Sequence, residues 1–147
     1  LKRVQHYIKD ETEFCFTYGD GVGDIDISAA LSFHRQQGTL ATVTAAAPPG
    51  RFGALEISNN RVTRFNEKPP GSEGMINAGF FILSPKVIDL IDDDQTPWES
   101  TPLETHAASQ QLSVRQHHGF WQPMDTLRDK NYLEDLWQKG NAPWKKW

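Results

Sequence analysis

Residues 13–21 have the sequence EFCFTYGDG, and this stretch predicts the class of the fold. The run up to Tyr18 is rich in aromatic residues, which are favoured in strands. Gly19 and Gly21 then allow the backbone to turn tightly. We therefore predict a buried strand that ends in a loop at Gly19, with the carboxylate of Asp20 projecting from that loop.

The chain alternates between strands and helices on both sides of this loop. In residues 26–37 the apolar side chains recur at helical spacing, with Asp24 or Asp26 as N-cap and Gly38 as the C-terminal stop. Further strands are predicted at 39–45, 53–57, 61–66, 76–83 and 112–117, and further helices from Ser84 to Leu90 or Ile91, at 102–110 and at 126–139. This alternation predicts an α/β fold with a mostly parallel sheet, in which ligands bind at the carboxyl ends of strands.

The composition suits one folded domain over residues 1–147. Hydrophobic residues make up 37% of the chain and charged residues 23%, which is enough apolar material for a core. The net charge of −4 argues against a nucleic-acid partner. No apolar run approaches the roughly 18 residues of a membrane span. The single cysteine, Cys15, stands between two phenylalanines and predicts a buried thiol in a reducing compartment, hence a cytoplasmic protein.

Asp20 is the first candidate for chemistry. Mg²⁺ takes oxygen ligands and is usually held by one or two carboxylates together with substrate phosphates. A carboxylate in a loop at the end of a strand is suited to that role. An aspartate between two glycines is also a common turn residue, so the pattern alone leaves both interpretations open.

Two segments carry side chains suited to a phosphorylated sugar. Arg51-Phe52-Gly53 is followed by Asn66-Glu67-Lys68-Pro69, in which lysine can meet a phosphate and the carboxylate can accept hydrogen bonds from sugar hydroxyls. A surface Glu-Lys pair would give the same pattern. Asn77, which opens the apolar strand 76–83, must find partners, so it either ties down a loop or binds a ligand. The small residues Ala78 and Gly79 would leave room for a ligand against that strand.

Asp125 is the last candidate. It follows the aromatic turn Gly119-Phe120-Trp121 and directly precedes the C-terminal helix. The alternative to a functional role is that Asp125 caps this helix.

Together these segments resemble the sugar-1-phosphate nucleotidyltransferase family. The segments YGDG, RFG, NEKP, INAGFF and GFWQPMDTLRD occur in the order of that family. The stretches PPGRFGAL, NEKPPG, GFWQPMDTLRDK and NAPWKKW are similar to its glucose-1-phosphate cytidylyltransferases in particular. The resemblance covers essentially the whole chain. It implies a partial nucleotidyltransferase Rossmann-like fold, with a mixed, mainly parallel sheet flanked by helices, and a reaction that joins CTP to glucose 1-phosphate and releases pyrophosphate.

The resemblance also implies the roles of particular residues. Asp20 and Asp125 would hold Mg²⁺ between the nucleotide α-phosphate and the sugar phosphate. The substrate-binding residues would be Gly53, Glu67, Lys68 and Asn77. Lys68 would contact the sugar phosphate, so it would also be catalytic, together with Asp20 and Asp125. The two aspartates should therefore converge on one cation beside the Glu67-Lys68 loop.

The sequence departs from the family at its start. It begins at Leu1 without the GGxGTRL loop that binds the triphosphate in the family, so we expect little turnover by this chain alone. The alternative is a non-catalytic module that binds a sugar phosphate or only assembles. Sheet edges exposed by a missing segment favour a homo-oligomer. The aromatic and basic tail 140–147 is expected to dock on its own domain or on a neighbouring subunit.

Overall fold

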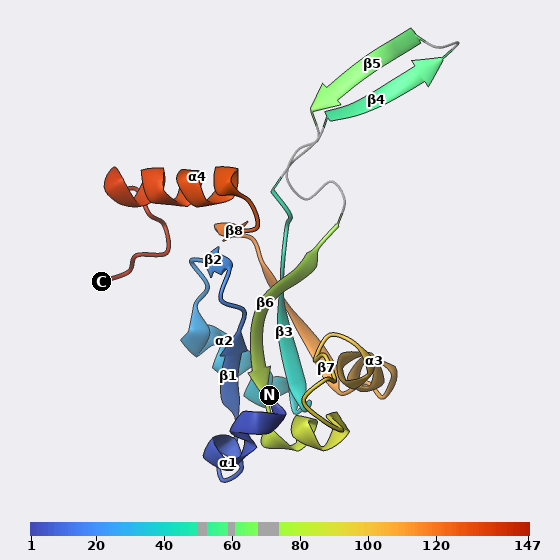
Figure 1. The fold of residues 1–147 in the computed structure, drawn as a ribbon, viewed down its shortest axis with the longest axis vertical. Helices are drawn as coiled ribbons and strands as arrows, with labels where there is room; N and C mark the ends of the chain where they lie inside the picture. Colours follow the sequence, from blue (N-terminus) through green and yellow to red (C-terminus); the bar gives the residue numbers. More distant parts are fainter. Residues whose placement is uncertain (50–52, 59–60, 68–73) are drawn as a thin grey trace. The chain divides into compact units, whose positions relative to one another are not determined.

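The computed structural model describes residues 1–49, 53–58, 61–67 and 74–147 (Figure 1). The chain forms two compact units that interleave along the sequence. Unit 1 comprises Leu1–Gly19, Asp26–Thr44 and Asn77–Gln116, and unit 2 comprises Asp20–Ile25, Ala45–Ile76 and His117–Trp147. The expectation of a single domain over the whole chain stays a prediction. Within the described residues, no helix has the length and apolar character that a membrane crossing requires.

Unit 1 is built on a sheet with the strand order β1-β6-β3-β7. The strands are β1 (Phe14–Thr17), β6 (Ile76–Leu83), β3 (Ala41–Ala46) and β7 (Leu112–His117). β6 runs antiparallel to β1, with Phe14 opposite Leu83 and Thr17 opposite Phe80. β1, β3 and β7 share the other direction (Figure 1). The α/β class with a mixed, mainly parallel sheet flanked by helices is therefore confirmed.

The helix α2 (Ile27–Gln37) has the ends that the sequence predicts. The Asp26 carboxylate accepts a hydrogen bond from the Ala29 N–H at 2.9 Å, and Gly38 ends the helix in the left-handed conformation. Its buried side is formed by Ala30 and His34, and the His34 ring nitrogen Nδ1 lies 2.8 Å from the Thr42 hydroxyl on β3. α2 therefore covers one face of the sheet.

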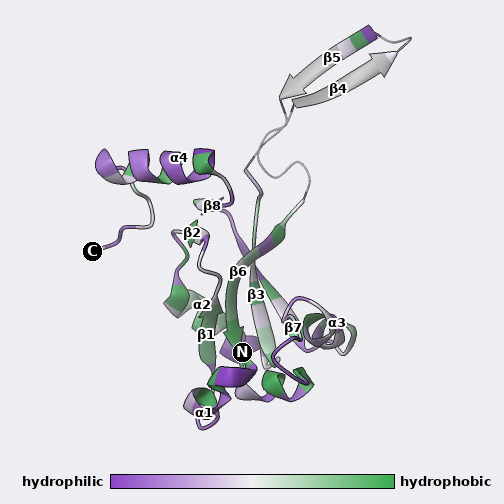
Figure 2. Cartoon of the chain, viewed as in Figure 1, coloured by the Kyte–Doolittle hydropathy of each residue, from purple (hydrophilic) through white to green (hydrophobic). Residues whose placement is uncertain are grey.

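The core of unit 1 lies against the other face. It contains buried residues from β3, from β6, from the 3-10 helix η2 (Pro85–Leu90) and from the segment after it: Ala41, Phe81, Leu83, Val87, Ile88, Ile91 and Trp98. Figure 2 shows the apolar colouring of β6, whose residues 81–83 are all buried. Since neighbouring strand residues face opposite sides of a sheet, β6 is covered on both faces, as its continuous apolar run predicts.

Eight further described elements complete the two units. Unit 1 adds η1 (Lys2–Val4), α1 (Gln5–Ile8) and α3 (Thr101–Ala108). Unit 2 contains the hairpin of β4 (Gly53–Ser58) and β5 (Arg61–Glu67), the ladder of β2 (Gly21–Gly23) and β8 (Trp121–Pro123), and α4 (Leu127–Gln138). The sequence patterns missed η1, α1, β2 and β8. These elements span only three or four residues each, which is too short for a periodic pattern.

The prediction of a buried Cys15 thiol is wrong. Side chains on β1 alternate between partly buried and exposed, and Cys15 occupies an exposed position between Phe14 and Phe16. Both phenylalanines pack against the core, so the apolar neighbours of the cysteine point to the opposite side of the strand. The thiol therefore gives no support to a reducing compartment.

Two buried histidines make the stability of unit 1 sensitive to acid. Burial lowers the pKa of His34 and of His106, although Glu13 acts in the opposite direction on His34 and Arg35 acts with burial. A histidine whose folded-state pKa lies below its unfolded value of about 6.5 takes up protons more readily when unfolded. Stability should thus be level above about pH 6.5 and should fall as the pH drops below that value.

Urea unfolding followed between pH 8 and pH 5.5 tests this expectation. Replacing His106 by leucine should flatten the pH dependence, because His106 is 2% exposed and its Nε2 atom has no hydrogen-bond partner among the described residues. His6→Leu is the matched control at an exposed histidine on α1 and should leave the slope unchanged. An unfolding midpoint that does not move between pH 7 and pH 5.5 would contradict the prediction.

Candidate functional site

The β2–β8 ladder brings Asp20 and Asp125 to neighbouring positions in unit 2. Gly21 pairs with Pro123, Val22 with Gln122 and Gly23 with Trp121. One step beyond the ladder, the Met124 N–H donates a hydrogen bond of 2.7 Å to the carbonyl oxygen of Asp20. The residue after Met124 is Asp125, and both aspartates are exposed. Two carboxylates far apart in sequence therefore emerge from adjacent backbone segments of one unit.

Asp125 is not the cap of the helix that follows it. The N-cap of α4 is Thr126, whose hydroxyl accepts a hydrogen bond from the Asp129 N–H at 3.2 Å. The Asp129 carboxylate accepts hydrogen bonds from the Thr126 N–H at 3.1 Å and from its hydroxyl at 2.8 Å, which completes a capping box. The alternative that Asp125 serves as the helix cap is therefore wrong.

A buried amide fixes β8 to α4 next to these aspartates. The Gln122 side chain donates a hydrogen bond of 2.9 Å to the same Asp129 carboxylate, and both residues are buried. Asp129 therefore holds the start of α4 and the middle of β8 at once. Through these contacts the backbone between Gln122 and Thr126, which carries Asp125, is held at both ends.

The donor set at this place suits a hard divalent cation. Within the described ranges, no cluster of three or more His, Cys, Asp or Glu side chains is placed to hold a metal ion by itself. Two carboxylates without further protein ligands match the way Mg²⁺ is usually bound, because this ion keeps waters and takes phosphate oxygens from substrates. Asp20 and Asp125 thus fit the ion that the sequence analysis assigned to them, and its binding stays a proposal.

Three of the predicted sugar-binding residues lie on described strands, namely Gly53 on β4, Glu67 on β5 and Asn77 on β6. Gly53 and Glu67 pair with each other across the β4–β5 hairpin, so a strand ladder joins the last residue of RFG to the glutamate of NEKP. Lys68 lies outside the described residues, as do Arg51 and Phe52. The approach of the Glu67-Lys68 loop to the two aspartates therefore stays a prediction.

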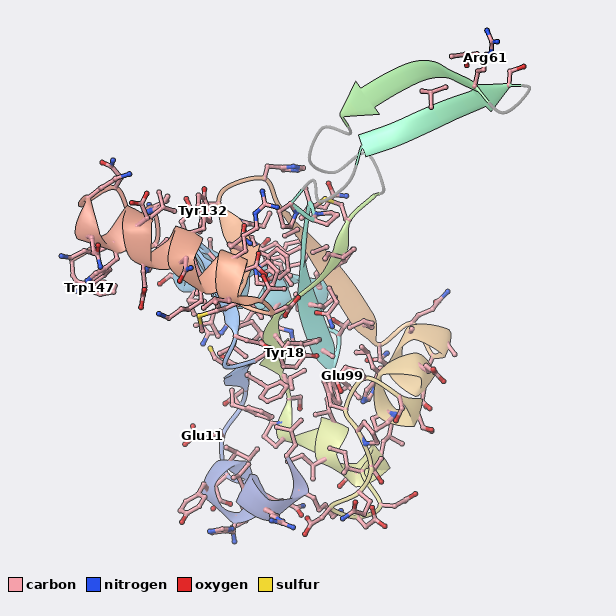
Figure 3. All side chains as sticks on the ribbon, turned by 45° about the horizontal axis from the view of Figure 1, so that its top comes forward. Glu11, Tyr18, Arg61, Glu99, Tyr132 and Trp147 are labelled. Carbon is pink, nitrogen blue, oxygen red and sulfur yellow. The ribbon has the colours of Figure 1, made fainter. Side chains whose placement is uncertain are left out.

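Asn77 is held within unit 1. Its side-chain oxygen accepts a hydrogen bond from the Gly79 N–H at 2.8 Å, and its side-chain nitrogen donates one of 3.3 Å to the Tyr18 hydroxyl. The expectation that Ala78 and Gly79 leave room for a ligand is wrong at Gly79. A Cβ atom at Gly79 would meet the Tyr18 ring, with Cε2 at 2.9 Å, so the aromatic side chain fills that space. Figure 3 shows Tyr18 among the packed side chains.

The sequence analysis missed a charged cluster beside the β2–β8 ladder. The Asp24 carboxylate lies 3.0 Å from His117 Nε2 and 3.8 Å from Lys146 Nζ, and a Cβ at Gly119 would collide with Asp24 and His117. The side chain of His117 is 10% exposed. No spacing rule links residues 24, 117 and 146, because the ladder and the tail bring them together.

Part of the C-terminal tail packs on unit 2. The rings of Trp144 and Phe120 lie 5.4 Å apart between centroids, and Lys145 Nζ lies 4.8 Å from the centroid of the Trp137 ring. Trp147 at the end of the chain is 83% exposed (Figure 3). The tail thus meets its own chain through Trp144, while its last tryptophan faces solvent.

Comparison with known proteins assigns the family. The model of the family described as nucleotidyl transferase matches residues 1–139. The chain belongs to the nucleotidyl transferase family. The family resemblance stated from the sequence is therefore confirmed.

Relatives of known name agree with this assignment. The chain is 60% identical over 147 residues to the glucose-1-phosphate cytidylyltransferase of Salmonella typhi, covering 100% of this chain and 57% of that protein. It is 31% identical over 141 residues to a mannose-1-phosphate guanylyltransferase catalytic subunit beta of Dictyostelium discoideum, covering 92% of this chain and 39% of that protein. The nucleotidyl transferase chain described here thus spans little more than half the length of the Salmonella relative.

A solved structure supports the fold. The crystal structure of HddC from Yersinia pseudotuberculosis matches with a TM-score of 0.63 at 20% identity, over 92% of this chain and 60% of that one. The chain therefore shares the α/β architecture of a larger protein.

Proposed function

We propose that this nucleotidyl transferase chain provides the metal-binding and sugar-binding part of an enzyme that converts CTP and glucose 1-phosphate to CDP-glucose and pyrophosphate. The observation that carries the proposal is the hydrogen bond from the Met124 N–H to the Asp20 carbonyl oxygen, which joins the backbone segments that carry Asp20 and Asp125. The 60% identity to a glucose-1-phosphate cytidylyltransferase supports this choice of substrates.

The chain's part in the reaction is to position two anions. An oxygen of the sugar phosphate attacks the α-phosphorus of CTP in line, a new P–O bond forms, and pyrophosphate leaves. Mg²⁺, when bound by Asp20 and Asp125, supplies positive charge between the two phosphorylated reactants. Lys68 binds the sugar phosphate, and Glu67 with the backbone near Gly53 orients the sugar hydroxyls. Such positioning removes much of the entropic part of the barrier.

The proposal predicts that each aspartate is needed for metal binding. Mn²⁺ can replace Mg²⁺ as an oxygen-seeking ion, and its binding to the chain is measured from the relaxation of water protons in the presence of glucose 1-phosphate. Asp20→Asn and Asp125→Asn should each weaken Mn²⁺ binding by roughly tenfold or more, because each removes one of two charged ligands. Asp92→Asn, at an exposed acid of unit 1, is the matched control and should bind as the unaltered chain does.

Turnover and binding separate the two possible functions of the chain. With CTP, glucose 1-phosphate and Mg²⁺ we expect little pyrophosphate release from this chain alone, whereas robust release would show that the residues present suffice for triphosphate binding. The alternative is a non-catalytic module that binds a sugar phosphate or only assembles. Calorimetry with millimolar glucose 1-phosphate tests this alternative, since a folded chain that gives no heat would retain only an assembly role.

Size-exclusion chromatography tests the proposed homo-oligomer, and a monomer would contradict it.

A further inference from the structure

The side-chain carboxamide of Asn77 is held in one of its two possible orientations. The Gly79 N–H is a donor and lies 2.8 Å from the Asn77 side-chain oxygen. An amide turned by 180° would place its NH₂ group against that N–H, donor against donor, so only one orientation satisfies the backbone. The Asn77 nitrogen must then face away from Gly79, and it lies 3.3 Å from the Tyr18 hydroxyl oxygen.

Tyr18 cannot easily leave this position. Its ring lies against Gly79, where a side chain would collide with it, and Gly79 itself has a φ of +78° that favours glycine. The ring also makes edge contacts with Phe16 at 5.8 Å and with Phe81 at 5.9 Å between centroids. Phe81 is 2% exposed and belongs to the core of unit 1. The core of unit 1 therefore holds the Tyr18 ring in place, and with it the hydroxyl that contacts Asn77.

One donor of Asn77 remains for a ligand. A carboxamide nitrogen has two N–H groups, and the contact with Tyr18 uses one. The second N–H has no hydrogen-bond partner among the described residues, and Asn77 is exposed. Because this N–H is held in one direction at the surface, it favours a ligand that presents an acceptor oxygen and disfavours a ligand that presents a donor.

We propose that Tyr18 is a positioning residue, which together with Gly79 orients the Asn77 carboxamide so that one N–H donates to an acceptor oxygen of the sugar phosphate. This inference rests on the proposed function, because it concerns how the same substrate is bound. The acceptor is either a phosphate oxygen or a hydroxyl oxygen of the sugar. Tyr18 acts through Asn77 and needs no contact with the substrate itself.

Two variants separate positioning from packing. Tyr18→Phe keeps the ring on Gly79 and removes only the hydroxyl, so binding of glucose 1-phosphate should weaken roughly three- to tenfold without loss of folding. Asn77→Asp still accepts from Gly79 and can accept from the Tyr18 hydroxyl, but it turns an oxygen toward the ligand. Its affinity should fall by roughly tenfold or more. Tyr7→Phe removes a hydroxyl from a 75% exposed tyrosine on α1 and should bind normally.

Calorimetry measures these affinities, and nuclear magnetic resonance of the Asn77 side-chain NH₂ group measures its geometry. In the unaltered chain, glucose 1-phosphate should shift the proton that Tyr18 does not use, whereas Tyr18→Phe should shift the other proton before any ligand is added. Titration with glucose alone and with orthophosphate alone then identifies the oxygen, since only the correct fragment should move the first proton.

The outcomes distinguish this inference from the function on which it rests. Normal binding by Tyr18→Phe, or ligand binding that leaves both Asn77 protons unmoved, would overturn the inference and leave the proposed function standing. An unaltered chain that fails to bind glucose 1-phosphate would overturn both. Weaker binding by Tyr18→Phe and Asn77→Asp, with Tyr7→Phe unchanged and all variants folded, would support it.

Discussion

Gly79→Ala is expected to destabilise unit 1 by about 2–5 kcal/mol, a large share of the stability of a small domain. Two costs add. A residue with a Cβ is strained at a φ of +78°, which costs about 1–2 kcal/mol. The new methyl group also meets the Tyr18 ring, which packs against Phe16 and Phe81. Overpacking of this kind costs about 1–3 kcal/mol.

Gly38→Ala is the matched control for this prediction. Gly38 has a similar φ of +66°, but nothing lies within 4 Å of the Cβ that alanine would add. Urea unfolding should therefore show a loss of about 1–2 kcal/mol for Gly38→Ala and a clearly larger loss for Gly79→Ala. In a Tyr18→Ala background, the cost of Gly79→Ala should shrink to that of the control. Equal losses for the two single variants would show that the ring does not crowd Gly79.

Asp129→Ala should be the most damaging single change in unit 2. The substitution removes the acceptor of three hydrogen bonds, from the Thr126 N–H, the Thr126 hydroxyl and the Gln122 amide. Loss of the helix cap costs about 1 kcal/mol, and loss of the charged acceptor of the buried Gln122 amide costs about 1–3 kcal/mol more, although that amide keeps a 3.3 Å hydrogen bond to the Pro123 carbonyl. We therefore expect a total loss of about 2–4 kcal/mol in the free energy of unfolding.

Asp135→Ala on the same helix provides the comparison. Asp135 forms an exposed ion pair of 2.7 Å with Lys139, and such pairs contribute about 0–1 kcal/mol. Amide hydrogen exchange should show faster exchange in β8 and in the first turn of α4 for Asp129→Ala and not for Asp135→Ala. If β8 remained as protected as before, the Asp129 carboxylate would not be what joins β8 to the helix.

The sequence predicted those parts of the fold whose signals are local. Asp26 and Gly38 are recognised as helix ends because capping and the left-handed conformation depend on residue type. The strand 76–83 is recognised because burial on both faces demands a continuous apolar run. At Asp125 the same kind of argument failed. Aspartate and threonine are both good caps, and only the contact with Asp129 selects Thr126.

The residues of the candidate site and the convergence of its two aspartates were predicted from the family resemblance and stay predictions, but the strand pairing beside them was not predicted. The family resemblance pointed to Asp20 and Asp125, whereas the pairing that brings them together comes from strands of three residues. No sequence pattern predicts that the Tyr18 ring packs on Gly79. A small residue suggests free space beside the strand, and only the tertiary structure shows which side chain fills that space. The burial of His106 and of His117 likewise depends on tertiary contacts, which no local pattern reveals.

The interleaved arrangement of the units has a consequence for synthesis on the ribosome. Unit 1 needs β7, which ends at His117, and unit 2 needs α4 and the tail beyond it. A nascent chain that has exposed β1 to β6 holds β3 without its neighbour β7, and it holds Asp20 before the β2–β8 ladder can join the Asp20 segment to that of Asp125. Cotranslational folding should therefore be late, and the emerging chain should rely on chaperones until α4 has left the exit tunnel.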